Sequence, residues 1–406
     1  MNPEQALAAA DCLAQPTLPA GQAWWLQSLA HGVPGIAMLH TELAAAGLRP
    51  WQRVHDWLTV AARSPVTTGA STGLFYGAPA LAFALTGAAV VHPGAYRDTL
   101  QILDARIAAD ARRRVRAAHA RITAGHLPVL AEFDTIRGLA GIGAYLLRRD
   151  PVGDAVRAVL GYLVDLAKPI VVAGKTLPGW WTLTGPAGRP DPGEFPGGHG
   201  NAGMAHGIGG PLALLVLAAR RGVTVPGQRE AIEAICGWLD FWRTDSGTGH
   251  IWPYLIRRAE QDTGQPRPRT RTARRPSWCY GTAGLARAQQ LAALVTGNAD
   301  RRRIAEHALV QALTDAAQRA ATTDASLCHG HAGLTHIAAR AAADAAPPAA
   351  ARLRELAAEL LAIAQPAPAE IGPGLLEGVT GVALACLAPA TGAPPTTGWD
   401  MCLLIA

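Results

Sequence analysis

The sequence predicts an all-α protein, an (α/α) toroid or barrel in which seven inner helices are ringed by seven outer ones. Three observations lead to this fold class: a repeated Gly-Xaa-Xaa-Gly step, an apolar segment after each step, and amphipathic segments between the steps. Repeats long enough for two helices are typical of helical repeat architectures, because each repeat buries its apolar face against its neighbours.

The Gly-Xaa-Xaa-Gly step occurs six times in full and once in degenerate form. Its first glycines are Gly32, Gly77, Gly138, Gly207, Gly281, Gly330 and Gly378. They are 45, 61, 69, 74, 49 and 48 residues apart, and the second copy has Ala80 where the others have a second glycine. We expect the glycines to allow a tight turn into each inner helix. The loops before these turns should then converge at one end of the barrel.

The segments around the steps divide into two kinds of helix. Residues 211–219 are apolar on nearly every side, which predicts an inner helix enclosed by protein. Residues 304–313 and 353–364 carry apolar side chains at i, i+3, i+4 and i+7, which predicts outer helices with one wet face. Glycines, Pro79 and threonines interrupt the uncharged stretch 65–91, so it is interpreted as a buried helix with its loop and not as a membrane span.

One domain is expected to span residues 1–406, since a closed repeat can spread a single core over that length. The longer steps of 61 and 69 residues leave room for a small inserted elaboration within about residues 90–200. Residues 174–203 are rich in Gly, Pro and Trp, which predicts a long loop ahead of His206. Long loops of this kind are often functional, and this one is a candidate for peptide binding.

Composition limits the class of protein. Half of the residues are hydrophobic and 16% are charged, which is typical of a globular chain and excludes a disordered one. The net charge is +6, with basic residues concentrated at 106–121 and 257–275. Such stretches could attract an acidic peptide or nucleic acid, but no nucleic-acid motif accompanies them, and a solvated Arg-rich surface is the favoured interpretation.

The cysteines point to a reducing compartment. Six cysteines are spread through 406 residues without the dense spacing of a disulfide scaffold, and the N-terminal residues lack the pattern of a secretory signal. We therefore expect a cytoplasmic protein with no membrane segment. Four of the six do not share the phase of the motifs discussed next and are expected to be small buried hydrophobes: Cys12, Cys236, Cys386 and Cys402.

Two short motifs offer a zinc site. Cys279 lies two residues before Gly281, and Cys328 lies two before Gly330, with His329 next to it. Because the two thiols share one phase in adjacent repeats, we expect them to be neighbours. Two cysteines and a histidine can hold zinc, and three protein ligands leave its fourth position open to a substrate. The sequence therefore predicts a catalytic zinc site made of Cys279, Cys328 and His329.

Four motifs taken together resemble the lanthionine synthetase C-like (LanC) cyclases over the whole chain. They stand at residues 134–141 (DTIRGLAG), 204–211 (MAHGIGGP), 278–281 (WCYG) and 328–330 (CHG), and Trp399-Asp400 resembles the family's C-terminus. The resemblance implies a barrel with seven inner helices, to which class I members add a small SH2-like elaboration. It also implies zinc held by Cys279, Cys328 and His329, with water or a substrate thiol as fourth ligand.

The activity implied by the resemblance is class I lanthipeptide cyclisation. A peptide cysteine adds to dehydroalanine or dehydrobutyrine and forms a lanthionine or methyllanthionine ring. The partners would be a dehydrated precursor peptide and a separate dehydratase, since no extra domain here would perform dehydration. The thiolate is the nucleophile, and zinc deprotonates a bound thiol.

The resemblance also implies an active-site set of His206, Asp134, Arg275 and Tyr280. His206 would give a proton to the enolate, because its ordinary pKa is near 6.5. Asp134 would take the thiol proton or orient His206, and Arg275 would hold the developing oxyanion. Tyr280 would support either role.

Plainer interpretations stay open at this stage. His206 is equally suited to a cap or a surface position, and Asp134 to accepting backbone N–H groups at a helix start. Arg275 belongs to a basic run in which Arg271 and Arg274 could serve the same purpose. Two other functions also remain: a zinc-bearing protein that binds a peptide or thiol without turnover, and an enzyme that adds glutathione to dehydrated residues. The presence of all four polar residues (Asp134, His206, Arg275 and Tyr280) favours the cyclase over these alternatives.

Overall fold

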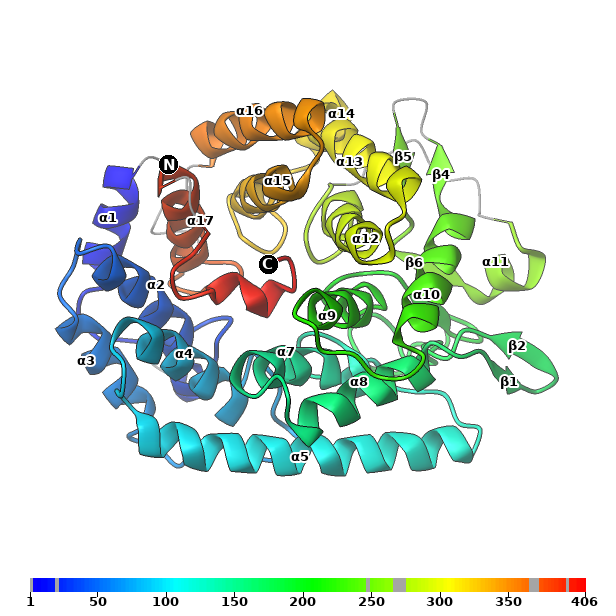
Figure 1. The fold of residues 1–406 in the computed structure, drawn as a ribbon, viewed down its shortest axis with the longest axis horizontal. Helices are drawn as coiled ribbons and strands as arrows, with labels where there is room; N and C mark the ends of the chain where they lie inside the picture. The colour runs from blue at the N-terminus through cyan, green and yellow to red at the C-terminus, as the bar shows by residue number, and fades with distance from the viewer. Residues whose placement is uncertain (1–2, 19–21, 246–248, 266–274, 365–371, 392–393) are drawn as a thin grey trace. The chain divides into compact units, whose positions relative to one another are not determined.

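The computed structural model describes residues 3–18, 22–245, 249–265, 275–364, 372–391 and 394–406. The chain divides into two compact units, whose helices and strands are labelled in Figure 1. The first unit comprises residues 1–107, 322–402 and 406. The second comprises residues 108–321 and 403–405. Helix α5 (Arg97–Thr123) runs from the first unit into the second.

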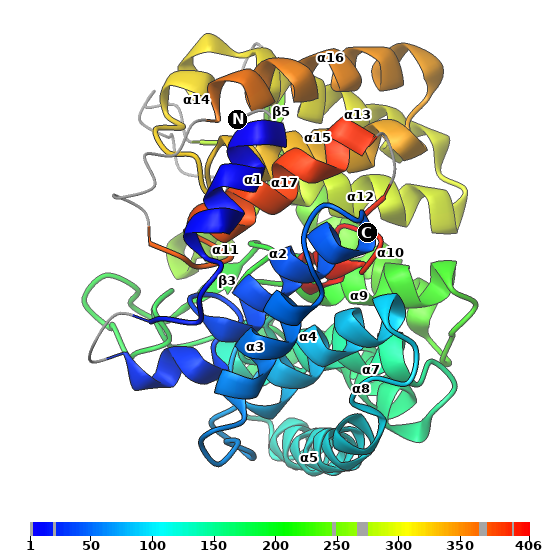
Figure 2. The same ribbon diagram turned by 90° about the vertical axis from the view of Figure 1, so that its left-hand side faces the viewer.

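The named elements of the first unit are all helices, joined by loops that contain two isolated β-bridges among the described residues. Its elements are α1 (Pro3–Cys12), η1 (Ala23–Gln27), α2 (Val33–Ala45), α3 (Gln52–Ala61), α4 (Ala78–Val91), α15 (His331–Asp344), α16 (Pro347–Ile363), α17 (Val379–Thr391) and η2 (Trp399–Leu403), which ends just past the unit. Helix α2 packs against α3, α4 and α17, and α15 packs against α16 and α17. Helix α1, near the start of the chain, packs along α17, which lies near its end (Figure 2).

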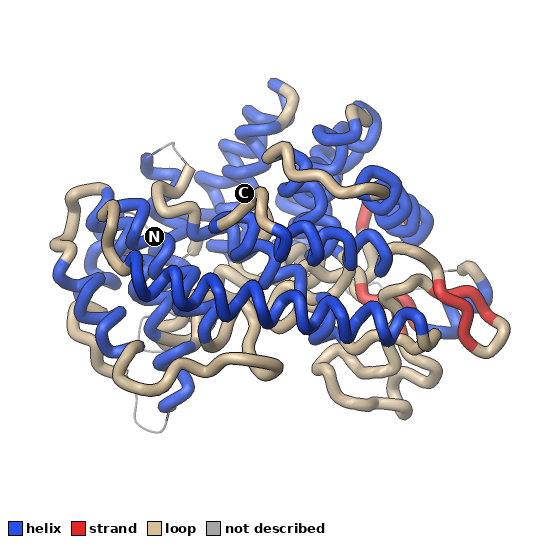
Figure 3. The backbone as a smooth tube through the Cα atoms, turned by 60° about the horizontal axis from the view of Figure 1, so that its bottom comes forward, coloured by secondary structure: helices blue, strands red, loops and turns tan. Residues whose placement is uncertain are grey.

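The second unit combines helices with short strands. Its helices are α6 (Leu130–Phe133), α7 (Leu139–Arg149), α8 (Asp154–Leu166), α9 (Gly209–Arg220), α10 (Gln228–Trp242), α11 (Arg258–Thr263), α12 (Thr282–Thr296), α13 (Ala299–Thr314) and α14 (Ala316–Ala320). Its strands are β1 (Ile170–Val172), β2 (Lys175–Leu177), β3 (His199–Asn201), β4 (Thr244–Asp245), β5 (His250–Ile251) and β6 (Leu255–Arg257). They pair antiparallel as β1 with β2, β3 with β6 and β4 with β5 (Figure 3).

The helices expected from the repeat are present at the expected places. A helix begins at or just after the first glycine of every copy: α2, α4, α7, α9, α12, α15 and α17. Helix α9 is buried from residue 209 through 218, as predicted for an inner helix. Helices α13 and α16 bury one face, as predicted for outer ones, and they pack along α12 and α15. The stretch 65–91 is a loop followed by the buried helix α4.

Close backbone packing explains the glycines. A Cβ atom on Gly330 would collide with the amide nitrogen of Ser326, and one on Gly333 would collide with the carbonyl oxygen of Leu327. The first collision, with the amide nitrogen four residues earlier in the chain, recurs at Gly207, Gly281 and Gly378. The second, with the carbonyl oxygen six residues earlier, recurs at Gly284 and Gly381. The turn therefore folds back beneath the start of its own helix. Among the first glycines of the full copies only Gly281 has a positive φ, so room for the backbone is the main requirement.

The degenerate second copy has a different turn. Gly73 and Tyr76 exchange backbone hydrogen bonds of 3.1 and 3.0 Å, and Gly77 has a φ of +77°. This left-handed conformation favours glycine at position 77. The side chain of Ala80 is fully buried where the other copies have a second glycine.

The segment in which a small elaboration is predicted, about 90–200, contains the whole of α5 and then α6, α7, α8, β1 and β2. The separate elaboration stays a prediction. The predicted loop 174–203 carries the short strands β2 and β3 at its ends, and residues 178–198 between them form no helix or named strand, with isolated bridges at Thr182 and Thr184. Trp180 and Trp181 in this loop are buried, and Trp181 packs with Trp242 and donates its indole N–H to the Gly197 carbonyl at 2.9 Å. Within the described part of the chain no helix has the length and apolarity needed to cross a bilayer.

The cysteines outside the zinc motifs follow the prediction with one exception. Cys236, Cys386 and Cys402 are buried, and burial raises the pKa of Cys236 and of Cys386 to about 12. Cys12 is exposed, so its predicted burial was wrong. It is the last residue of α1, next to exposed Asp11, and this end of the helix faces solvent.

Two buried histidines should make the fold sensitive to acid. Burial lowers the pKa of His40 and of His199 to about 4. An unfolded histidine binds its proton near pH 6.5, so the stability due to the neutral buried form is complete above that pH and is lost as the pH falls toward 4. We expect the free energy of unfolding to decrease by up to about 3 kcal/mol per histidine between pH 7.5 and 4. Urea denaturation at both pH values measures it. An identical pH dependence in His40→Gln and His199→Gln would contradict this assignment.

Candidate active site

The turn before α12 holds Cys279 rigidly. The Ser277 hydroxyl donates a hydrogen bond to the Tyr280 carbonyl, and the Trp278 indole N–H donates to the Leu403 carbonyl at 2.8 Å. The Cys279 carbonyl accepts the amide of Met204 at 3.0 Å, which joins this turn to the one before α9. The Cys279 side chain is buried, with Sγ 3.7 Å from the Ser277 hydroxyl.

His206 lies in the turn before α9 and is held by Asp134. Nδ1 of His206 is 2.7 Å from one carboxylate oxygen of Asp134, whose residue is 1% exposed. A carboxylate only accepts, so Nδ1 carries the proton and Nε2 is left for other contacts. The second carboxylate oxygen accepts the amides of Arg137 at 2.6 Å and Gly138 at 2.8 Å. Asp134 therefore both holds the turn that precedes α7 and orients an imidazole that is 32% exposed.

A second contact ties these two turns together. Thr135 donates its amide to the Ala205 carbonyl at 3.1 Å and its hydroxyl to the Met204 carbonyl at 2.6 Å. The backbone on both sides of the Asp134 to His206 hydrogen bond is thus fixed. The pair is a preorganised feature of the second unit.

Tyr280 lies beside the imidazole. Its ring centroid is 6.5 Å from that of His206, and its hydroxyl accepts a hydrogen bond of 3.0 Å from the Asn201 side chain. Tyr254 packs on the other side, with ring centroids 5.7 Å apart, and donates its hydroxyl to the Arg275 carbonyl at 2.7 Å. Arg275 is half-buried at the start of the Cys279 turn, whereas Arg271 and Arg274 lie outside the described residues.

Asn201 and Tyr254 were missed by the sequence interpretation. Neither belongs to a Gly-Xaa-Xaa-Gly turn. The antiparallel pairing of β3 with β6 brings them near the site, because Asn201 ends β3 opposite Leu255, next to Tyr254. The strands are three residues long, too short for the sequence pattern to reveal their pairing.

The turn before α15 carries the other two predicted ligands. The Cys328 amide donates to the Leu376 carbonyl at 2.8 Å, and the His329 amide donates to the Ser326 hydroxyl at 3.2 Å. Two carboxylates flank the His329 imidazole: Asp324 lies 3.5 Å from Nε2, and Glu377 lies 4.0 Å from Nδ1. The sequence interpretation missed both acids, although Glu377 precedes Gly378 as His329 precedes Gly330.

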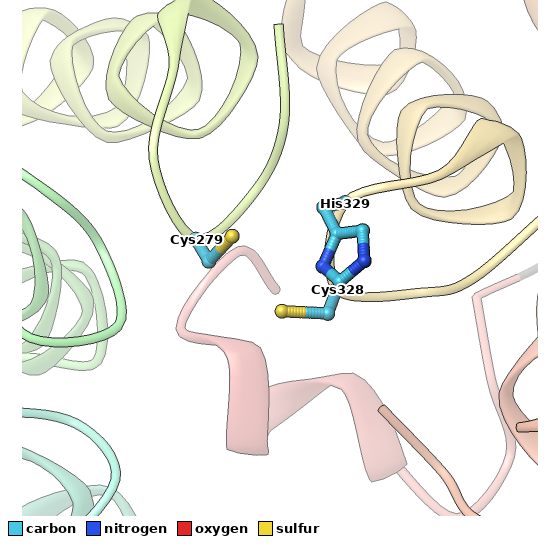
Figure 4. Close-up of side chains that lie close together, drawn as sticks. All are labelled: Cys279, Cys328 and His329. Atoms are coloured by element: carbon cyan, nitrogen blue, oxygen red, sulfur yellow. The ribbon is translucent and has the colours of Figure 1, made fainter. Parts of the chain in front are cut away.

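The three predicted ligands form one potential metal-binding group among the described residues. The Sγ atoms of Cys279 and Cys328 and a ring nitrogen of His329 all lie within 4.8 Å of one another. Figure 4 shows the Cys328 sulfur directed toward Cys279, with the imidazole of His329 beside it. Neither cysteine is in a disulfide, both side chains are buried, and the imidazole is half-buried. Two thiols and one imidazole are a donor set that zinc accepts with a fourth position open.

The profile of the family described as "Lanthionine synthetase C-like protein" matches residues 23–404. The chain belongs to this family. Among solved structures, the LanC-like chain matches "Nisin cyclase" with a TM-score of 0.79 and 20% sequence identity, covering 99% of this chain and 96% of that one. At this identity the likeness shows the fold alone, and it confirms the predicted (α/α) toroid class. No curated protein sequence matches the chain.

Asp134 should be a stability residue as well as a partner of His206. Asp134→Ala removes the acceptor of three hydrogen bonds in a buried place, so we expect a loss of about 2–4 kcal/mol in the free energy of unfolding. Asp134→Asn keeps one carbonyl oxygen for the amides of Arg137 and Gly138 and should cost less than half as much. Urea denaturation of both variants measures the difference. Equal losses would show that these two amide hydrogen bonds contribute little.

Proposed function

We propose that this LanC-like protein is a zinc-dependent lanthipeptide cyclase. It would add a cysteine thiol of a dehydrated precursor peptide to dehydroalanine or dehydrobutyrine and close a lanthionine or methyllanthionine ring. The observation that carries the proposal is the convergence of two buried thiols and an imidazole within 4.8 Å, in a chain of this family. A separate dehydratase would supply the dehydrated peptide.

The donor set suits this chemistry. Cys279, Cys328 and His329 would hold the metal, which would lower the pKa of a substrate thiol and so supply the nucleophilic sulfur. Two thiolate donors reduce the positive charge at the site more than three imidazoles would, which leaves more electron density on that sulfur. The reaction conserves its atoms: the thiol loses a proton, sulfur bonds to the β-carbon, and the α-carbon gains a proton.

His206 is the residue we assign to proton transfer. Its Nδ1–H is committed to Asp134, so Nε2 is the nitrogen available to carry a proton to the α-carbon. Asp134 is buried and already accepts three hydrogen bonds, from His206, Arg137 and Gly138. This environment favours its role in orienting His206 over the alternative of taking the thiol proton itself.

Tyr280 and Arg275 are assigned to the enolate. The Tyr280 hydroxyl accepts a hydrogen bond from Asn201, and a phenol can also donate its own proton to an oxyanion. Arg275, always cationic, would hold the developing negative charge on the carbonyl oxygen. One such donor is often worth about 3 kcal/mol of transition-state stabilisation.

The reaction itself can be tested directly. Purified protein loaded with zinc is incubated with a dehydrated, cysteine-containing peptide, and loss of free thiol is followed with and without a chelator. We expect thiol loss that requires metal and a product of unchanged mass. Persistent thiols across several peptides would favour a binding protein without turnover. If thiol is lost only when glutathione is added, and the peptide gains the mass of glutathione, the result would favour the glutathione-adding enzyme.

The metal ligands make a separate prediction. Cys328→Ala leaves one thiol and one imidazole, and we expect it to abolish stoichiometric zinc binding, measured by metal analysis after dialysis. Cys236→Ala is the matched control, because Cys236 is also buried but lies on α10 outside the group. Zinc retained by Cys328→Ala at the wild-type level would remove Cys328 from the ligand set.

His206→Ala should separate catalyst from ligand. Its side chain is not among the metal group, so we expect full zinc content together with a fall in turnover of about 100-fold or more, the usual contribution of a positioned acid or base. The readout is the rate of thiol loss at saturating peptide. Turnover within threefold of wild type would exclude His206 as the proton donor.

A further inference from the structure

The residue just before the first glycine occupies the same place in the sequence of each repeat. These seven residues are His31, Tyr76, Arg137, His206, Tyr280, His329 and Glu377. The proposed function uses His206, Tyr280 and His329, and it assigns nothing to His31 or Glu377. Both of these lie in the first unit with Cys328 and His329.

Three turns of the first unit are hydrogen-bonded side by side. The Ala30 carbonyl accepts the amides of Leu375 at 2.7 Å and Leu376 at 3.1 Å, and the Leu376 carbonyl accepts the amide of Cys328 at 2.8 Å. A Cβ on Gly374 would lie 3.0 Å from the Cα of His31, so these turns are in direct contact. Glu377 and then His31 are therefore the next turn residues along from Cys328 and His329.

His31 belongs to a surface cluster of three aromatic rings. The imidazole stacks on Trp25, with centroids 5.9 Å apart and an interplanar angle of 18°. Trp24 meets His31 edge-on at 5.2 Å and Trp25 at 6.1 Å. The residue Trp24 is 46% exposed, and the side chain of Glu377 is 57% exposed. A partly exposed tryptophan leaves apolar area available for a partner, and tryptophan is a frequent anchor of binding surfaces.

We propose that Trp24, Trp25, His31 and Glu377 form a recognition surface for the dehydrated precursor peptide, a proposal that rests on the function proposed above. The ring faces would pack on apolar and dehydrated residues next to the reacting cysteine, since those residues are flat or apolar. The Glu377 carboxylate would pair with a Lys or Arg of the peptide. The surface fits the substrate because its turns are continuous with the turn that carries Cys328 and His329.

The aromatic part is tested with a dehydrated peptide whose cysteine is replaced by serine, which binds without ring closure. We expect Trp24→Ala and His31→Ala each to weaken its Kd about tenfold and to raise KM for the cyclisable peptide, with kcat and zinc content unchanged. Trp51→Ala is the matched control. Trp51 packs on His92 in the same unit, with ring centroids 5.1 Å apart. It lies beyond the C-terminal end of α2, whereas His31 precedes the N-terminal end of that helix. Circular dichroism confirms that each variant is folded.

Glu377 is tested by exchanging charge. Two peptides that carry Lys or Glu beside the reacting cysteine are compared in wild type and in Glu377→Lys. We expect wild type to bind the Lys peptide about two- to fivefold better, as for an exposed ion pair, and the preference to reverse in the variant. The same preference in both proteins would remove Glu377 from the surface.

The outcomes keep the two proposals distinct. If wild type closes rings while Trp24→Ala and His31→Ala keep the wild-type Kd and KM, the recognition surface is overturned and the cyclase stands. If wild type binds the serine peptide through these residues but consumes no thiol from the cysteine peptide, the cyclase is overturned and the surface stands. If Trp24→Ala only dissociates a dimer, with peptide affinity unchanged, the rings serve self-association and the recognition surface is overturned.

Discussion

Backbone packing against backbone at the repeat glycines is the constraint on which the site depends. At Gly330 and Gly333 the chain folds back so closely under the start of α15 that no side chain would fit at either position. The same collisions at Gly281 and Gly284 fix the turn before α12. Each turn therefore presents the residue before its first glycine in a defined place, and the functional side chains differ from turn to turn while the backbone that holds them stays the same.

Rigid turns also make it possible to keep polar groups in buried places. Asp134 is almost fully buried, yet its two oxygens accept three hydrogen bonds, two from amides of the turn before α7 and one from His206. A buried carboxylate without those partners would be costly. The structural and the chemical interpretations of Asp134 are thus not alternatives, because the carboxylate that holds the turn before α7 also orients the imidazole.

The proposed peptide surface follows from the same arrangement. Turns of adjacent repeats bond to one another through Ala30, Leu376 and Cys328, so a residue without a role in the proposed chemistry can lie next to one that has a role. Glu377 and His31 are in this position. Glu377 is exposed beside the half-buried His329, and half-buried His31 stacks with Trp25, so both suit contact with a substrate segment that the chemistry itself does not touch.

The sequence by itself determined the helix order and the three residues of the potential metal-binding group, because glycine spacing and helical periodicity are local and Cys279 and Cys328 share one phase of the repeat. Asn201 and Tyr254 could not be predicted, since the pairing of β3 with β6 that brings them near Tyr280 depends on residues over fifty positions apart in strands of three residues. The exposure of Cys12 was likewise decided by how α1 packs on α17. Only the tertiary structure showed which acids flank His329 and which rings surround His31, because contacts between turns are made by folding and leave no periodic trace in the chain.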